Sequence, residues 1–169
     1  KKFAADLTST EDTLKQALIS YENFLNKSFT ICVYLTATDI FRKVSWIKQA
    51  VKTLKDNPNI ESCFSANSTH KNYWFENKKN NWKRILPSMK EYSSRQIKKP
   101  IYREDTGLAC ASRSFLWRKG KRIGNKVKLL INNNQETNID IHSKYDLYIA
   151  KKTIEYFKKN DPNKLPNSR

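Results

Sequence analysis

The spacing of apolar residues predicts two long amphipathic helices, one toward each end of the chain. In the first, over residues 10–26, apolar positions recur at helical spacing, as Leu14, Ala17, Leu18, Tyr21 and Leu25. The second follows residue 143 and ends near residue 159, with apolar positions at Leu147, Ala150, Ile154 and Phe157. Capping boxes, Ser9-x-x-Asp12 and Ser143-x-x-Asp146, precede both runs and predict where each helix begins.

Short apolar runs between these helices predict strands. Residues 29–35 are apolar on both faces, which is typical of a buried strand in a parallel sheet. A helix that ends near residue 57 and a strand at 60–66 follow, which is the order of a right-handed crossover unit. Further strands are predicted at 108–111 and 127–131.

The order of these elements predicts one α/β layered domain with a mostly parallel sheet. The domain is expected to span residues 1–160, because a chain of 169 residues suits a single domain. Residues 113–119 are predicted to form a helical turn that ends at Gly120. The tail at 161–169, which contains two prolines, is expected to fray.

Residues 67–90 combine lysines and asparagines with aromatic side chains. The segment from Asn77 to Asn81 predicts a turn between two short strands, and therefore a hairpin. Basic residues among aromatic ones can stack nucleobases. A hairpin whose aromatic side chains pack on the sheet is nevertheless the favoured interpretation, and residues 91–106 are predicted to form a loop.

Charge and cysteine content narrow the classes of function. The formal net charge is +17, from 33 Lys and Arg against 16 Asp and Glu, which is compatible with nucleic-acid binding. The lysines are spread along the whole chain, so a solvated basic surface is the favoured explanation of the positive charge. Binding of an anionic nucleotide substrate is a further explanation of this charge. Three scattered cysteines predict buried free thiols in a reducing cytoplasm. No apolar run is long enough to predict a transmembrane span.

The most informative run is 138–146, where Asp140 and His142 lie two positions apart in a segment predicted to be extended, just before the last helix. Alternate residues of a strand face the same way, so the carboxylate and the imidazole are expected to share one face. Ligands in open α/β sheets bind at the carboxyl ends of strands. A helix cap on a solvated edge is the competing interpretation of the same residues.

Three blocks of the chain resemble motifs of the acylneuraminate (CMP-sialic acid) cytidylyltransferase family. Residues 140–147 resemble its Asp-Ile-Asp-Thr-x-x-Asp-Leu motif, with His142 in place of the second Asp. Residues 35–42 resemble Leu-Gln-Pro-Thr-Ser-Pro-Leu-Arg, with Thr36 in place of the substrate-contacting Gln. A third block resembles the Arg-Gln and Tyr-Arg-Glu-Asn-Gly motifs around the family's sugar site; its residues here are Arg95, Gln96, Tyr102, Arg103, Glu104, Thr106 and Gly107.

This resemblance implies a three-layer α/β/α fold with a Rossmann-like sheet of the nucleotide-diphospho-sugar transferase type. It implies a reaction of CTP with a nonulosonic (sialic-acid-like) sugar acid that gives the CMP-sugar and pyrophosphate. The family's Arg-x-Gly-Ser-Lys phosphate loop is absent from the sequence. An N-terminally truncated domain without the first strand and this loop is therefore expected. Family members form homodimers, and the segment that would reach the partner is 113–137.

The resemblance also implies a role for each candidate residue. Asp140 would bind a Mg²⁺ cofactor, and His142 would neighbour the metal or deprotonate the sugar hydroxyl. Arg95 and Arg103 would bind the substrate carboxylate, because guanidinium groups bind carboxylates bidentately. The remaining substrate-binding candidates are Thr36, Thr38, Arg42, Gln96, Tyr102, Thr106 and Gly107.

Two other classes of function stay open at this point. The chain could be a non-catalytic relative of the family, since His142 and the missing phosphate loop both depart from the family pattern. It could also be a basic α/β module that binds nucleic acid. The charge and the aromatic hairpin allow this function, but nucleic acid is the less favoured partner.

Overall fold

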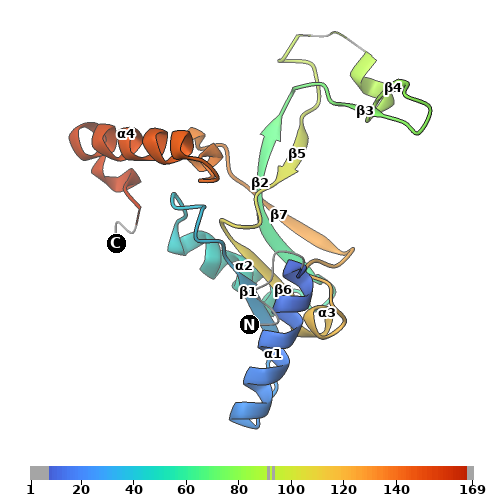
Figure 1. Cartoon of the computed structure of the whole chain (residues 1–169), viewed down its shortest axis with the longest axis vertical. Coiled ribbons are helices and arrows are strands. Elements are labelled where there is room, and N and C mark those ends of the chain that lie inside the picture. The colour runs from blue at the N-terminus through green and yellow to red at the C-terminus, as the bar shows by residue number, and fades with distance from the viewer. Residues whose placement is uncertain (1–7, 91, 93, 167–169) are drawn as a thin grey trace.

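The computed structural model of the chain describes residues 8–90, 92 and 94–166, and these form a mixed α/β fold (Figure 1). The α-helices are α1 (Thr10–Leu25), α2 (Val44–Asp56), α3 (Ser114–Arg118) and α4 (Lys144–Asn160). The strands are β1 (Ile31–Tyr34), β2 (Ser62–Thr69), β3 (Trp74–Glu76), β4 (Trp82–Arg84), β5 (Ile101–Glu104), β6 (Cys110–Arg113) and β7 (Val127–Ile131). Short 3-10 helices occupy Pro87–Lys90, Gln135–Asn138 and Pro162–Lys164.

The main sheet is centred on β2. On one edge of β2, β6 pairs antiparallel with its first half and β5 pairs antiparallel with its second half. On the other edge β7 pairs parallel to β2. The outer strand β1 pairs antiparallel with β6, so β1, β2 and β7 run in the same direction and β6 runs against them.

The sheet is therefore mixed, and the prediction of a mostly parallel sheet was wrong at the level of strand pairing. One of the pairings, β2 with β7, is parallel, whereas β1 with β6 and β2 with both β5 and β6 are antiparallel. The cause is β6, which inserts between β1 and β2. Its small apolar residues predicted a buried strand, but a short run of this kind carries no information about strand direction.

Helices cover both faces of the sheet at β1. Cys32 packs with Leu18 of α1 and with Leu116 and Trp117 of α3. Its neighbour Ile31 packs in a different cluster with Ala50 and Leu54 of α2 and with Cys63 and Ala111. Successive residues of a strand point to opposite faces, so α1 and α2 lie on opposite sides of this strand. A Rossmann-like three-layer arrangement beyond these contacts stays a prediction.

Helix α4 packs on the loop after β1 rather than on the sheet. Phe41 lies edge-on to Phe157, with ring centroids 6.1 Å apart, and Ala150 completes the buried cluster. Ile139, Ile141 and Leu165 pack against the same cluster. The tail that was predicted to fray contains the 3-10 helix at Pro162–Lys164 and also Leu165. Residues 167–169 of this tail lie outside the described residues, and so do residues 1–7 of the predicted domain.

Several local predictions are confirmed. The Ser9 and Ser143 hydroxyls accept hydrogen bonds from the backbone N–H groups of Asp12 and Asp146, as capping boxes require. Gly120, at a φ of 69°, ends α3 in the left-handed conformation. The three cysteines are buried free thiols, and burial raises the pKa of Cys110 to about 11. Among the described residues no helix is long and apolar enough to cross a membrane.

The predicted hairpin forms, but its aromatic side chains do not pack on the sheet. Strands β3 and β4 pair with each other in a separate two-stranded sheet. We call the described residues of segment 70–99, which are 70–90, 92 and 94–99, the arm, because they project away from the main sheet beyond the end of β2 (Figure 1). Segment 91–106, predicted as a loop, contains β5, which pairs with the end of β2 and so supports the base of the arm.

Leu54 is expected to carry much of the packing of α2, because its side chain is 0% exposed among Ala50, Cys63 and Ala111. Leu54→Ala should lower the free energy of unfolding by about 2–5 kcal/mol, through lost burial and the cavity left behind. Val44→Ala is the matched control, since Val44 lies in the same helix and is 62% exposed. Urea unfolding followed by circular dichroism measures both, and equal effects would contradict this packing.

Candidate functional site

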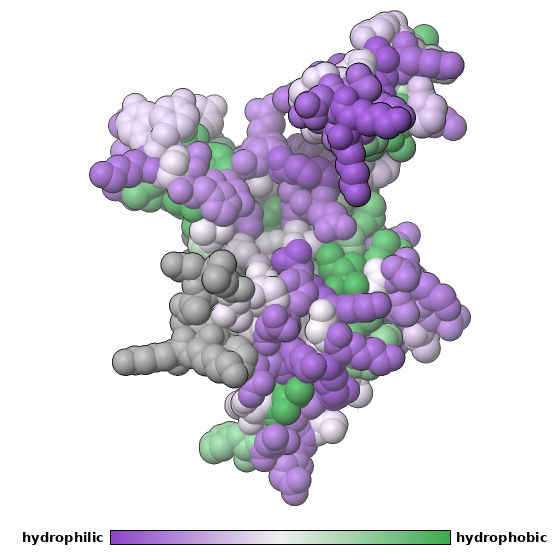
Figure 2. Space-filling view, turned by 45° about the vertical axis from the view of Figure 1, so that its right-hand side comes forward, coloured by the Kyte–Doolittle hydropathy of each residue, from purple (hydrophilic) through white to green (hydrophobic). Residues whose placement is uncertain are grey.

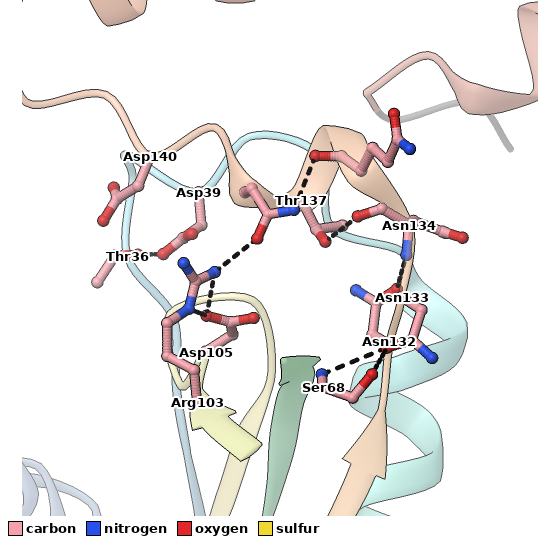
Figure 3. A network of polar contacts seen from close by, with 12 residues as sticks. Thr36, Asp39, Ser68, Arg103, Asp105, Asn132, Asn133, Asn134, Thr137 and Asp140 are labelled. Carbon is pink, nitrogen blue, oxygen red and sulfur yellow. Dashed lines mark hydrogen bonds and ion pairs between the residues drawn. The ribbon is translucent and has the colours of Figure 1, made fainter. Parts of the chain in front are cut away.

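Three segments that are distant in the sequence meet beside the ends of β1 and β2. They are the loop after β1, the turn between β5 and β6, and the segment between β7 and α4. Together they line a cleft of about 330 Å³. Residues from all three point into this space in Figure 3. The lining includes five of the predicted site residues, namely Thr36, Arg103, Thr106, Gly107 and Asp140.

The first two segments are joined at Gly107. The backbone N–H of Thr36 donates to the carbonyl of Gly107 at 3.2 Å. A Cβ atom at Gly107 would lie 1.9 Å from Asp39 Oδ2 and 2.2 Å from Thr36 Oγ1. Only glycine allows the turn to come this close, so Gly107 has a structural reason to stand here, independent of any ligand.

Arg42 fixes the loop after β1 from within. Its Nε donates to the carbonyl of Asp39 at 3.0 Å, and its Nη2 donates to the carbonyls of Asp39 and Thr36. The guanidinium predicted to contact substrate thus closes the loop onto itself. Thr38 also has a structural role in this loop, because its carbonyl accepts a hydrogen bond from the N–H of Ile141 at 3.3 Å. This bond ties the loop to the third segment.

The third segment is held by a side-chain contact to β2 and by hydrogen bonds within the segment (Figure 3). Asn133 Oδ1 accepts from the hydroxyl of Ser68 at 2.7 Å, and Asn132 Oδ1 accepts from the N–H of Asn134 at 3.1 Å. The Thr137 hydroxyl then donates to the carbonyl of Asn134 at 2.6 Å. These contacts fix the chain just before Asn138 and Asp140 reach the cleft.

Asp140 and His142 lie in an irregular segment and not in the predicted strand, but the predicted alternation holds. Ile139 and Ile141 pack on the cluster beneath α4, while Asp140 lines the cleft. His142 Nε2 lies 2.7 Å from Asp140 Oδ2. The side chain of His142 is 72% exposed and that of Asp140 is 42% exposed, so the pair sits at the open rim.

Asp39 and Asp105 join Asp140 in the cleft, and neither was predicted as a site residue. Burial raises the pKa of Asp39, the Thr36 hydroxyl at 2.5 Å opposes this, and the charge of Asp140 raises the pKa further. Burial also raises the pKa of Asp105, the nearby Arg103 guanidinium lowers it, and the charges of Asp39 and Asp140 add to the rise. Mutual repulsion of this kind requires the carboxylates to be close neighbours.

Two carboxylate oxygens of the cleft are buried and unsatisfied. Asp105 Oδ2 and Asp140 Oδ1 have no hydrogen-bond partner among the described residues. Buried unpaired carboxylate oxygens are costly, which makes a bound cation or water favourable here. The described residues contain no group of three or more His, Cys, Asp or Glu side chains already arranged to hold a metal ion. Mg²⁺ does not need one, because it is commonly held by one or two carboxylates, waters and substrate phosphates.

A second, larger cavity of about 670 Å³ adjoins the cleft, and we call it the basic groove. The cationic residues that line it are Lys71, Arg95 and Arg103, and none of the described residues that line it is acidic. Arg103 and Asn138 line both cavities. The Arg103 guanidinium donates to Asp105 Oδ1 at 2.9 Å and to Asn138 Oδ1 at 2.9 Å, and so forms the wall between them.

Four predicted substrate residues line neither cavity, namely Thr38 and Arg42 in the loop after β1, Tyr102 and Gln96. Tyr102 is 50% exposed and precedes Arg103 in β5, and adjacent residues of a strand point to opposite faces. Gln96 is exposed and lines neither the cleft nor the basic groove, although its neighbour Arg95 lines the groove. Asp39, in the loop after β1, and Asp105, directly after β5, were missed as site residues, because the position of a loop after a strand does not say which other loops it meets.

Comparisons with known proteins add no assignment. No protein-family model matches the sequence, and no curated protein is significantly similar to it. The interpretation of the site therefore rests on its geometry and on the motif resemblance of three short blocks.

Gly107→Ala tests the close approach that shapes the cleft. The added methyl group would overlap two polar side chains, so the loop after β1 must shift, and we expect about 1–3 kcal/mol of destabilisation. Gly120→Asn is the control, because nothing lies within 4 Å of a Cβ there and Asn tolerates the left-handed conformation. Thermal unfolding compares the two, and an unchanged melting temperature in Gly107→Ala would show that the contact is loose.

Proposed function

We propose that this chain binds and activates a nonulosonic sugar acid, using CTP as the nucleotide donor and releasing pyrophosphate. The observation that carries the proposal is the convergence at one cleft of Thr36, Arg103, Gly107 and Asp140. These residues come from the three blocks that resemble the cytidylyltransferase motifs. Such convergence is expected if the blocks form one site, and it has no obvious cause if the resemblance is accidental. The same proposal includes a Rossmann-like, three-layer core.

The carboxylates of the cleft suit a Mg²⁺ cofactor. Asp140 would hold the ion together with Asp105, because each has a buried oxygen without a partner among the described residues. When bound, the ion would offset negative charge on the phosphate oxygens at which nucleotidyl transfer takes place. Asp39 is less available, since its Oδ2 already accepts from the Thr36 hydroxyl.

The sugar acid would occupy the boundary between the cleft and the basic groove. Its carboxylate is the kind of group that Arg95 and Arg103 bind, and both line the groove. His142 is oriented by its contact with Asp140 and reaches the open rim, where it can accept a proton from a sugar hydroxyl. An indirect role beside the metal remains the alternative for this residue.

A non-catalytic relative of the family is the competing proposal. It would keep the cleft and the groove for binding and lack turnover, which fits His142 in place of an acidic residue. Ligand binding without pyrophosphate release would identify this case.

Asp140→Ala should abolish CTP-dependent pyrophosphate release and leave the melting temperature nearly unchanged, because the side chain lies at the rim and is 42% exposed. The loss should exceed about 100-fold in kcat. Glu155→Ala is the control, since this exposed carboxylate of α4 pairs with Lys152 and does not line the cleft. The assay needs Mg²⁺, CTP and a set of 2-keto sugar acids. Turnover that survives Asp140→Ala would refute the assignment of Asp140.

The arm is the proposed contact with a second copy of this chain. Segment 113–137 was the expected dimer contact, but its α3 packs on α1 and its β7 pairs with β2 within the subunit. In the arm, by contrast, large apolar side chains are exposed: Tyr73, Trp74, Phe75, Trp82, Ile85, Leu86, Tyr92 and Ile97. A cluster of this kind is typical of an interface.

The arm is also basic, with nine Lys and Arg against two Glu over residues 70–99, and the Arg84 guanidinium stacks 4.1 Å from the Trp74 ring. Single-stranded nucleic acid is therefore the competing partner. The surface turned toward the viewer in Figure 2 is largely hydrophilic, with scattered apolar patches and a hollow between the lobe of α4 and the arm.

The dependence on salt concentration distinguishes the two proposed partners of the arm, a second copy of this chain and single-stranded nucleic acid. Sedimentation velocity should show dimers that persist or strengthen from about 0.1 M to about 0.5 M NaCl, since screening weakens repulsion between basic arms. Trp82→Ser should shift the chain toward monomer, whereas Phe24→Ser should not, although Phe24 on α1 is even more exposed, at 81% against 64% for Trp82. A monomer that binds single-stranded DNA with a steep salt dependence would overturn the dimer in favour of nucleic acid.

A further inference from the structure

Arg103 lies between two cavities of opposite charge. The cleft is lined by the carboxylates of Asp39, Glu104, Asp105 and Asp140, and Arg103 is its cationic lining residue. The basic groove is lined by Lys71, Arg95 and Arg103, and no carboxylate lines it in the described part of the chain. The same guanidinium therefore offsets the charge of the cleft or adds to the charge of the groove, depending on where it points.

Arg103 is held on the side of the cleft. Its Nη2 lies 2.8 Å from Asp105 Oδ1, and it also donates to Asn138. The side chain of Arg103 is half exposed, whereas that of Asp105 is only 9% exposed. The carboxylate is thus the fixed member of the pair and the guanidinium is the member with room to move (Figure 3).

Asp105 is placed to contact a second cation. One of its oxygens binds Arg103, and the other, Oδ2, is buried without a partner among the described residues. Asp140 lines the same cleft with an equally unsatisfied buried oxygen. Small hard cations such as Mg²⁺ and Mn²⁺ prefer carboxylate oxygens.

We propose that a divalent cation and Arg103 compete for Asp105, so that cation binding in the cleft releases Arg103 to an anion in the basic groove. The inference rests on the proposed function in one respect, namely that the groove takes an anionic substrate. It assigns Asp105 and Arg103 a further task, which is to couple the two ligands.

The physical argument is one of charge balance. A doubly charged ion at Asp105 weakens the attraction that holds the guanidinium in the cleft and adds repulsion to it. Without an anion in the groove, the turn of Arg103 toward Lys71 and Arg95 is unfavourable, because like charges repel. An anion bound in the groove makes the turn favourable. Because coupling between two ligands is reciprocal, the anion must strengthen cation binding by the same factor.

Isothermal titration calorimetry on the full chain tests the coupling, with Mn²⁺ and N-acetylneuraminate as probes. We expect the wild-type affinity for N-acetylneuraminate to rise about fivefold or more in saturating Mn²⁺. Asp105→Asn should lose most of the Mn²⁺ affinity and bind N-acetylneuraminate more tightly than wild type without metal, with no response to Mn²⁺. Glu104→Gln is the matched control, because it removes a neighbouring charge of the cleft and should keep the coupling.

Arg103→Ala provides a second test that does not depend on changing a buried residue. Without the competing guanidinium, Mn²⁺ should bind more tightly than in wild type, while N-acetylneuraminate should bind more weakly. These opposite signs are not expected of a variant that is merely misfolded. Circular dichroism checks that each variant is folded.

Three results would overturn the inference: equal N-acetylneuraminate affinity with and without Mn²⁺, coupling that survives Asp105→Asn, or no binding of either probe to the wild-type chain. Pyrophosphate release is measured separately. Coupling without turnover would keep this inference and refute the enzyme, whereas turnover without coupling would do the reverse.

Discussion

The cleft depends on the close approach of the chain at Gly107 to the loop after β1. The carbonyl of Gly107 accepts from the N–H of Thr36, and no side chain larger than hydrogen fits between the turn and the Thr36–Asp39 pair. This single contact sets the distance between Asp39 in the loop after β1 and Asp105 in the turn before β6. Since Arg42 closes the loop from its other side, the loop offers the cleft a fixed wall.

A second constraint orients the remaining wall. Ile139 and Ile141 are anchored in the apolar cluster under α4, so the residues between and after them must face away from it. The helix cap at Ser143 fixes where α4 begins, and Asp146 accepts from the N–H of His142 at 3.1 Å. Apolar anchoring and a helix cap thus place Asp140 in the cleft without any strand pairing.

The sequence predicts best those features that nearest neighbours determine. The capped starts of α1 and α4, the hairpin of β3 and β4, and Gly120 at the end of α3 all follow from spacing over a few residues. Strand β5 was missed because Ile101–Glu104 is mostly polar and exposed, and its pairing partner in β2 is distant in the sequence. The direction of β6 was missed because a short buried run of small residues carries no information about strand direction.

The candidate site shows the same difference between local features, which the sequence predicts, and contacts between distant segments, which it does not. The resemblance to cytidylyltransferase motifs indicated Thr36, Arg103, Thr106, Gly107 and Asp140, and these residues do line one cleft.

Arg42 donates to backbone carbonyls of its own loop, and a guanidinium used in this way has the same sequence signature as one that binds a substrate. The carboxylates of Asp39 and Asp105 gain their meaning only from each other and from Asp140, through repulsion that no local pattern encodes. Electrostatic coupling between loops is therefore the part of this site that required the fold.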